Sequence, residues 1–288
     1  MSSSAPNRAA EGGAAEGGAT EGGATESGAT GGGTGADAPR AAFRNRPFSH
    51  VGNFTDYMTK TVEAVTRLVP QGGRVLDVPA GNGLLSAALR ERGFAVTSGD
   101  INRERPDFAY VDMGKPLPFA DASFDAVLCL EGIEHLLEPY AFFSEMWRIM
   151  APGGLLVVTT PNVMSLYSRL HFLALGTPYQ FRPCQQRRVP QGVMEDRGHI
   201  AQMSYLHLRY YTHCHGGTIL PPDGDKTKRK VLYPLYLALW AGAWLAARGG
   251  AFRPDPRWPD PDWDECRRHV LSRPVMLARS LIFMAQKP

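Results

Sequence analysis

The sequence predicts an α/β fold in which helices cover both faces of a doubly wound, mostly parallel sheet. Short apolar runs of strand length alternate with segments of helical periodicity between residues 53 and 162. A turn containing Gly81 and Gly83 joins one such strand to the next helix. Three predicted strands also end at an aspartate. Strands that alternate with helices are joined by right-handed crossovers and therefore form a parallel sheet.

The first part of the chain lies outside this pattern. From Glu11 the 288-residue sequence repeats a pentapeptide of Glu, Gly, Ala and Thr that contains no large apolar residue. Such a segment cannot offset the entropy lost on ordering. We therefore expect residues 1–42 to be a disordered tail and residues 43–288 to form one domain. No secretory signal is expected, because the start lacks both a basic region and an apolar run.

The elements of the first half follow from periodicity and from the residues that end them. Apolar residues at helical spacing predict a helix over 53–69, which a Pro-Gly-rich turn at 70–73 ends. A buried strand is expected at 74–78, and Gly93 closes a helix over 84–92. The other elements expected here are strands at 94–98, 108–111, 124–130 and 155–160 and a helix over 139–150, which a turn at 151–154 ends.

The second half gives a weaker pattern. Helices are expected over 163–175 and 203–213, separated by a loop at 176–198 that is rich in Pro, Gln and Arg. Strands are expected at 218–220 and 280–285, the latter pairing antiparallel at the sheet edge. The segment between these strands, 221–275, is then an insertion that carries one apolar helix.

The apolar run at 231–247 allows three interpretations. Its length is near the minimum for a membrane-spanning helix, and Pro234 and Gly242 interrupt it, so spanning is the less favoured reading. Trp240, Trp244 and the flanking basic residues suit a peripheral contact with a bilayer. The alternative is a buried helix that covers the sheet.

Charge and cysteine content limit the partners. The formal net charge is +3, and the basic cluster at 226–230 is either a solvated loop or a contact for an anionic lipid or substrate. Aromatic and basic residues do not alternate as in single-strand binders, so no nucleic-acid partner is expected. The four cysteines form no CxxC pair or disulfide framework, which indicates a reducing, cytoplasmic setting.

The three aspartates at strand ends, Asp77, Asp100 and Asp112, predict a ligand with three polar parts. Asp77 lies beside the glycine turn, where an anion opposes a pyrophosphate and can accept a hydrogen bond from an ammonium group. Asp100 can bind both hydroxyls of a ribose, and Asp112 can accept from the exocyclic amine of adenine. S-adenosylmethionine joins an amino acid, a ribose and an adenine in that order.

Five segments together resemble the motifs of class I S-adenosylmethionine-dependent methyltransferases of the small-molecule branch, which includes ubiquinone and menaquinone biosynthesis enzymes: 74–83, 99–100, 112–113, 117–136 and 152–154. The resemblance implies a Rossmann-like sheet of seven strands with an antiparallel last strand. Pro79 departs from the family, which usually has glycine at that position. The expected cofactor-binding residues are Asp77, Ala80, Gly81, Asn82, Gly83, Asp100, Ile101, Asp112, Met113, Leu130 and Glu131.

Methyl transfer from a sulfonium is an in-line displacement that mainly requires alignment, and a base assists a hydroxyl nucleophile. His135 and His199 are the candidate catalytic bases. His135 could equally pack or cap, because related enzymes often need no dedicated base. His213 and His215 lie two residues apart beside Cys214, which is not a metal-ligand spacing, so no metal is expected.

Three functions stay open at this point. The first is methyl transfer to a small-molecule or lipid-linked acceptor, most simply at oxygen, in the cytoplasm or at a membrane surface. The second is a nicotinamide-dependent oxidoreductase, since residues 80–86 resemble a dinucleotide-binding turn and Asp100 follows at a suitable distance. The third is a non-catalytic protein that binds a nucleoside. The sequence does not give the oligomeric state.

Overall fold

The computed structural model describes residues 53–101, 105–183 and 198–288, which belong to the compact unit Arg46–Pro288. The expected tail lies outside the described residues, as does most of the loop at 176–198. The strands are β1 (Arg74–Asp77), β2 (Ala95–Asp100), β3 (Ala109–Tyr110), β4 (Phe124–Leu130), β5 (Met150–Pro161), β6 (Thr218–Gly224) and β7 (Ser280–Gln286). The helices are α2 (Asp56–Leu68), α3 (Leu84–Arg90), η1 (Ile133–His135), α4 (Pro139–Ile149), α5 (Leu166–Leu175), α6 (Tyr205–Cys214), η2 (Lys230–Leu232), α7 (Tyr233–Arg248), α8 (Trp263–Val270) and α9 (Arg273–Leu277).

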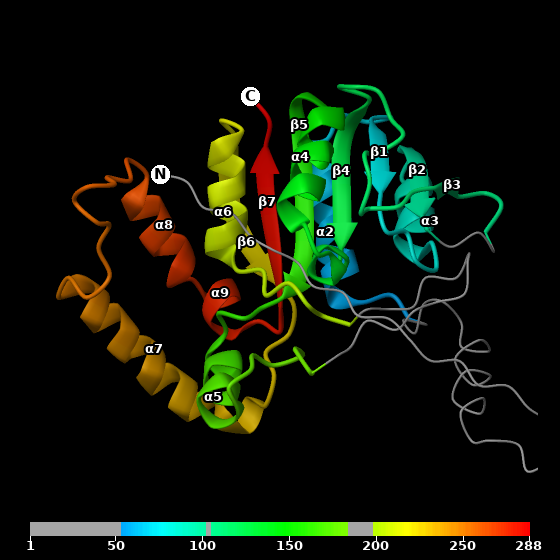
Figure 1. Cartoon of the computed structure of the whole chain (residues 1–288). Helices are drawn as coiled ribbons and strands as arrows, with labels where there is room; N and C mark the ends of the chain where they lie inside the picture. The colour runs from blue at the N-terminus through cyan, green and yellow to red at the C-terminus, as the bar shows by residue number, and fades with distance from the viewer. Residues whose placement is uncertain (1–52, 102–104, 184–197) are drawn as a thin grey trace, which may run out of the picture. The chain divides into compact units, whose positions relative to one another are not determined.

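The seven strands form one sheet in the order β3-β2-β1-β4-β5-β7-β6 (Figure 1). β1 pairs in parallel with β2 and with β4, and β4 pairs in parallel with β5. β7 runs antiparallel to both of its neighbours. The predicted doubly wound sheet with an antiparallel last strand is therefore confirmed. Its strand order reverses between β1 and β4, which opens a ligand crevice at their carboxyl ends.

Three sequence predictions about strands were wrong in detail. β7 lies inside the sheet rather than at its edge, because its nearly continuous apolar residues are buried on both faces and β6 covers it. β6 runs on to Gly224, so the insertion between β6 and β7 begins after that residue and not at 221. β5 begins at Met150, with a register shift between Phe124 and Ala126, so the expected turn at 151–154 forms its irregular start.

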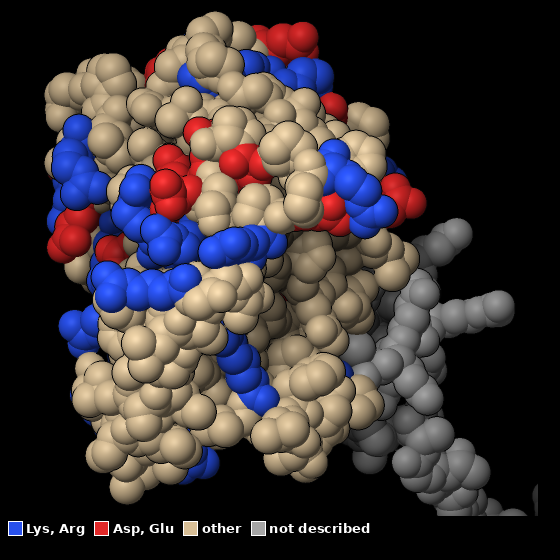
Figure 2. All heavy atoms as spheres, turned by 90° about the vertical axis from the view of Figure 1, so that its left-hand side faces the viewer, with Lys and Arg blue, Asp and Glu red and all other residues tan. Residues whose placement is uncertain are grey.

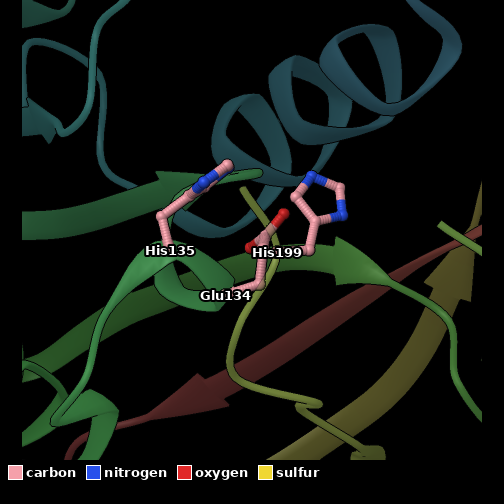
Figure 3. Close-up of side chains that lie close together, drawn as sticks. All are labelled: Glu134, His135 and His199. Atoms are coloured by element: carbon pink, nitrogen blue, oxygen red, sulfur yellow. The ribbon is translucent and has the colours of Figure 1, made fainter. Parts of the chain in front are cut away.

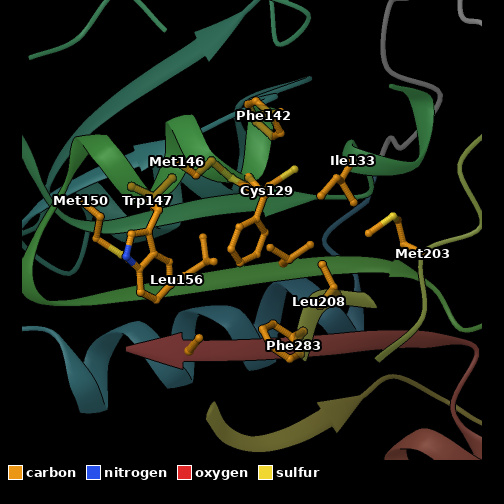
Figure 4. Close-up of a cluster of buried hydrophobic side chains, with 14 of the residues drawn as sticks. Cys129, Ile133, Phe142, Met146, Trp147, Met150, Leu156, Met203, Leu208 and Phe283 are labelled. Carbon is orange, nitrogen blue, oxygen red and sulfur yellow. The ribbon is translucent and has the colours of Figure 1, made fainter. Parts of the chain in front are cut away.

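Two hydrophobic layers cover the sheet, one on each face. Neighbouring residues of β1 point to opposite layers, as expected for a strand buried on both sides: Val75 packs with α2 and α3, whereas Leu76 packs with α4 and α6. Figure 4 shows the second layer, which includes Phe142 and Trp147 of α4 and Phe283 of β7. These layers fix the strands whose ends carry the site.

α7 is not the buried helix that one sequence interpretation gave. Only Tyr236 and Ala247 of its side chains are buried, and it packs on α5 and α9 rather than on the sheet. In the described part of the chain, Lys230–Arg248 is the one helix whose length and composition would suit a membrane span, and 11% of it is buried. The helix therefore presents apolar side chains outward.

Candidate functional site

The glycine turn after β1 is shaped by the end of β2. Gly81 and Gly83 have φ angles of 54° and 79°, a region that side chains with a Cβ rarely adopt. The backbone N–H of Gly81 donates to the Asp100 carboxylate at 2.8 Å, and the N–H of Ala80 donates to the Gly99 carbonyl at 2.9 Å. Asp100 is 3% exposed. Asp100, which is expected to bind the ribose hydroxyls, thus also stabilises the turn that contains the other expected cofactor-binding residues.

Asp77 is almost completely buried beneath this turn. Its carboxylate accepts a hydrogen bond from the Ser86 hydroxyl of α3 at 2.6 Å. Burial, followed by the charge of Asp100, raises the pKa of Asp77 to about 7, although the Ser86 hydrogen bond opposes the shift. Sequence reasoning missed Ser86, whose hydroxyl comes within reach because α3 begins directly after the turn. Asp77 is therefore a buried acid that exchanges its proton near neutral pH.

Pro79, the departure from the family pattern, packs against Gly132 in the turn after β4. A Cβ on Gly132 would lie 2.5 Å from Pro79 Cδ and 3.2 Å from Cys129 Sγ. Cys129 is fully buried, and burial raises the pKa of its thiol, so this residue acts as a small hydrophobe. The two turns that face the crevice are thus in direct contact.

Four further predicted cofactor residues lie in the glycine turn or after β2 and β3. The Asn82 side-chain oxygen accepts from the N–H of Leu84 at 3.1 Å, a local hydrogen bond within the turn that leads into α3. The Asp112 carboxylate accepts from the N–H of Gly114 at 2.9 Å and pairs with Lys115, which shapes the turn after β3. Met113 packs on the core layer below that turn, and Ile101 is half-buried after β2. None of these contacts tests their expected role in cofactor binding.

Leu130 and Glu131 end β4 at the same edge of the sheet. Leu130 belongs to the core, whereas Glu131 has a positive φ of 49° and donates its N–H to Thr159 of β5 at 3.0 Å. Burial raises the pKa of the Glu131 carboxyl, and the charge of Arg279 opposes this. Burial and the Glu131 charge also raise the pKa of Tyr57 on α2. Tyr57 is one of the apolar residues whose spacing predicted this helix, and the sequence carried no signal for a role of either Tyr57 or Arg279 beside Glu131.

The two predicted bases, His135 and His199, lie together although 64 positions separate them in the chain (Figure 3). Their ring centroids are 4.9 Å apart in an edge-to-face arrangement. The backbone carbonyl of Glu134 accepts from the N–H groups of Ile200 and Ala201, both at 2.9 Å, and so fixes the segment that carries His199. His135 ends η1, three residues after Gly132. η1 thus begins directly after Gly132, the residue that contacts Pro79.

Glu134 completes a group that sequence reasoning did not recognise. One ligand atom from each of Glu134, His135 and His199 lies within 4.8 Å of the others, and Glu134 is fully buried. Imidazole nitrogens and a carboxylate oxygen are common ligands of divalent cations. The group can hold such an ion as well as serve as a base. The histidines weighed from sequence have other partners: His207 caps α6, and His215 stacks on Phe143 and Trp147.

Comparison with known proteins identifies the family. A family profile described as "Methyltransferase domain" matches residues 53–215. The chain belongs to this methyltransferase family. That membership favours the first of the three expected functions over the oxidoreductase.

Two curated relatives are similar over part of the family region. A demethylmenaquinone methyltransferase of Beutenbergia cavernae is 45% identical over 96 residues, which is 30% of this chain and 40% of the relative. A ubiquinone biosynthesis O-methyltransferase of Xylella fastidiosa is 34% identical over 121 residues, 37% and 47% of the two chains. The chain thus spans about half the length of these relatives or less. A SAM-dependent methyltransferase structure from Archaeoglobus fulgidus is 17% identical at a TM-score of 0.48, over 80% of this chain and 94% of that one.

Replacing Gly132 by alanine should disrupt the contact between the two turns. The new methyl group would overlap the Pro79 ring, which is closed onto the backbone nitrogen and cannot rotate away. We expect a loss of about 1–3 kcal/mol in the free energy of unfolding. We also expect weaker binding of S-adenosylmethionine, because the turn that begins at Pro79 would be displaced. Denaturant titration and calorimetry measure the two effects. Gly242→Ala on α7 is the matched control, because nothing lies within 4 Å of that position. Equal behaviour of the two variants would refute the packing argument.

The raised pKa of Asp77 predicts a pH-dependent stability. The unfolded carboxyl ionises near its ordinary pKa of about 3.9, whereas the folded one ionises at about 7. Between these values the folded state holds the proton more tightly, so the free energy of unfolding falls as the pH rises. Asp77→Asn removes this penalty. Its stability relative to wild type should therefore increase by about 3 kcal/mol between pH 5 and pH 8. Denaturant titrations at both pH values test this, with the exposed Asp56→Asn as control. A difference that stays constant with pH contradicts the assignment.

Proposed function

We propose that this chain transfers a methyl group from S-adenosylmethionine to an oxygen of a small-molecule or lipid-linked acceptor. The observation that carries the proposal is the contact of the glycine turn with the turn that leads into the histidine pair. This contact supports a site in which the glycine turn would bind the cofactor close to the two imidazoles. Family membership supports the reaction class, and an O-methyltransferase among the relatives supports oxygen as the acceptor atom.

Each aspartate at a strand end would bind a different part of the cofactor. Asp77 and the turn at 80–83 would receive the methionine part, because an ammonium group favours the ionised form of a carboxyl whose pKa is near 7. Asp100 would bind the ribose hydroxyls, and Asp112 with Met113 and Ile101 would receive the adenine. Leu130 and Glu131 would close the crevice from β4. The donors that already hold Asp77 and Asp100 fix these carboxylates before the cofactor arrives.

The sulfonium supplies an activated methyl group, so the protein's task is to align the acceptor and remove its proton. His135 or His199 would take the hydroxyl proton of the acceptor as it attacks. The geometry also favours a second role, in which Glu134, His135 and His199 hold a divalent cation that makes an acceptor hydroxyl more acidic. The two roles use the same residues and differ in their dependence on metal.

Support for the acceptor class comes from the relatives and from α7. Two relatives are named as a demethylmenaquinone methyltransferase and a ubiquinone biosynthesis O-methyltransferase. A largely exposed apolar helix suits an enzyme that takes such an acceptor at a membrane surface in the cytoplasm. A soluble phenolic acceptor is the alternative.

Calorimetry of the full chain with S-adenosylmethionine, S-adenosylhomocysteine and NAD tests the cofactor. The first two should bind and NAD should not. Asp100→Asn should weaken binding of both about 10- to 100-fold, because hydrogen bonds to a charged group are lost. Binding of NAD without binding of S-adenosylhomocysteine would overturn the proposal in favour of an oxidoreductase. Cofactor binding without methyl transfer to any phenolic or lipid-linked acceptor would favour a binding protein.

The histidine pair is tested by methyl-transfer rates. His135→Ala and His199→Ala should lower kcat roughly 10²- to 10⁴-fold and leave the Kd of S-adenosylmethionine unchanged, as expected for a lost proton acceptor. The exposed His213→Ala is the control. If a cation is involved, a chelator should abolish wild-type activity, and Mg²⁺ or Zn²⁺ should restore it. Full activity in both histidine variants would exclude either role.

A further inference from the structure

α5 and α7 form an apolar surface on the side of the molecule that carries the site. The two helices contact each other and lie beyond the carboxyl ends of the parallel strands (Figure 1). Leu173 is 82% exposed and Leu245 is 64% exposed, values far above those of core leucines. Leu175, Leu235, Leu237 and Trp244 are also exposed. We call these six side chains the apolar face.

The opposite side of α7 is already used by the protein. Tyr236 and Trp240 pack with α5 and α9, and the Trp240 indole N–H donates to the Leu271 carbonyl at 2.7 Å. A helix that is apolar on all sides needs an apolar environment on all sides. Among the described residues, apolar partners cover only the side of α7 that faces α5 and α9. An exposed apolar surface of this extent indicates an interaction site.

Basic residues border the apolar face and point to the charge of its partner. Figure 2 looks at this side of the molecule and shows a largely uncharged lower region beneath a band of lysine and arginine side chains. The Arg248 guanidinium stacks on Trp244 at 3.6 Å from the ring centroid. Arg267 pairs with Asp264 at 3.0 Å, which partly balances its charge. A partner that matches the exposed apolar side chains and the basic residues beside them has an apolar part bordered by negatively charged groups.

A groove between α7 and α8 combines the same two properties. Its volume is about 740 Å³, and Leu237, Trp240, Trp244 and Leu271 line it together with Arg267 and Arg268. Apolar walls fit a hydrocarbon chain, and guanidinium groups bind phosphate. The groove therefore matches one lipid chain with its anionic headgroup.

We propose that the apolar face docks on an anionic phospholipid leaflet, with Arg248, Arg267 and Arg268 at the phosphates and a lipid chain in the groove. α7 lies flat in this arrangement. Its 16 residues span about 24 Å, less than the roughly 30 Å of a hydrocarbon core, and Tyr236 and Trp240 tie it to the protein. Docking turns the carboxyl edge of the sheet towards the bilayer. The docking rests on the proposed function in one respect: its role would be to give the enzyme access to a lipid-linked acceptor.

Vesicle flotation of the full chain tests the docking. Wild type should float with vesicles of phosphatidylcholine and phosphatidylglycerol, and much less with phosphatidylcholine alone. Leu173→Gln/Leu245→Gln should reduce binding at least roughly tenfold, because two exposed leucines no longer enter the leaflet. Arg267→Gln/Arg268→Gln should reduce it about fivefold for each arginine and weaken its dependence on salt. All four positions are partly or fully exposed, so the variants should fold.

Two matched controls should float like wild type. One is Leu206→Gln on α6, and the other is the double variant Arg67→Gln/Arg92→Gln, with Arg67 on α2 and Arg92 just after α3. Wild type that stays unbound with anionic vesicles would overturn the docking. A second outcome would also overturn the docking: no flotation, together with a concentration-dependent dimer that the leucine variant abolishes. In that case a second copy of the chain would cover the apolar face. Calorimetry with S-adenosylmethionine separates the proposals, since the docking variants should bind it like wild type.

Discussion

The contact between Pro79 and Gly132 is the constraint on which the candidate site depends. β1 and β4 are neighbours at the point where the strand order reverses, so the turns that leave them must pass each other closely. Glycine at 132 leaves room for the proline ring, and η1 follows at once with His135 at its end. Because the Glu134 carbonyl then holds the segment at 200–201, one close backbone approach positions both histidines relative to the turn.

Burial of acids at the same edge links stability to ligand binding. Asp77 and Glu131 both have raised pKa values because burial disfavours their ionised forms, and Asp100 adds a third buried carboxyl. Protein groups satisfy these acids with neutral donors, a hydroxyl for Asp77 and a backbone N–H for Asp100. Neutral donors orient a carboxyl without cancelling its charge. In the function proposed above, a cationic part of the ligand would supply a compensating charge, which a dinucleotide would not.

Periodicity predicted most elements because each is a local property of the chain. β4 and the start of α4 agree with expectation to the residue. Asp77 and Asp100 end β1 and β2, as the strand pattern predicted. The place of β7 depends on a pairing over more than 50 positions with β6, which no local signal encodes. Likewise, His135 and His199 could each be singled out, but their meeting with Glu134 depends on backbone hydrogen bonds between distant segments. The sequence did not predict the roles of the Ser86 hydroxyl beside Asp77 and of the Arg279 charge beside Glu131. Serine and arginine are common residues, and only the folded structure shows which of them lie next to a buried acid.

The apolar helix α7 shows how a correct element prediction leaves its environment undecided. Its sequence is apolar on every side, and such a helix can be buried in protein, span a membrane or lie between the two. Tyr236 and Trp240 fix its inner side to α5 and α9, which excludes an independent span, while the exposure of Leu237, Trp244 and Leu245 excludes the core. The arrangement that we propose for it is interfacial. This arrangement would account for Arg248 at the end of the helix and for Arg267 and Arg268 on α8, because their long stems can reach from an apolar surface to the level of the phosphates.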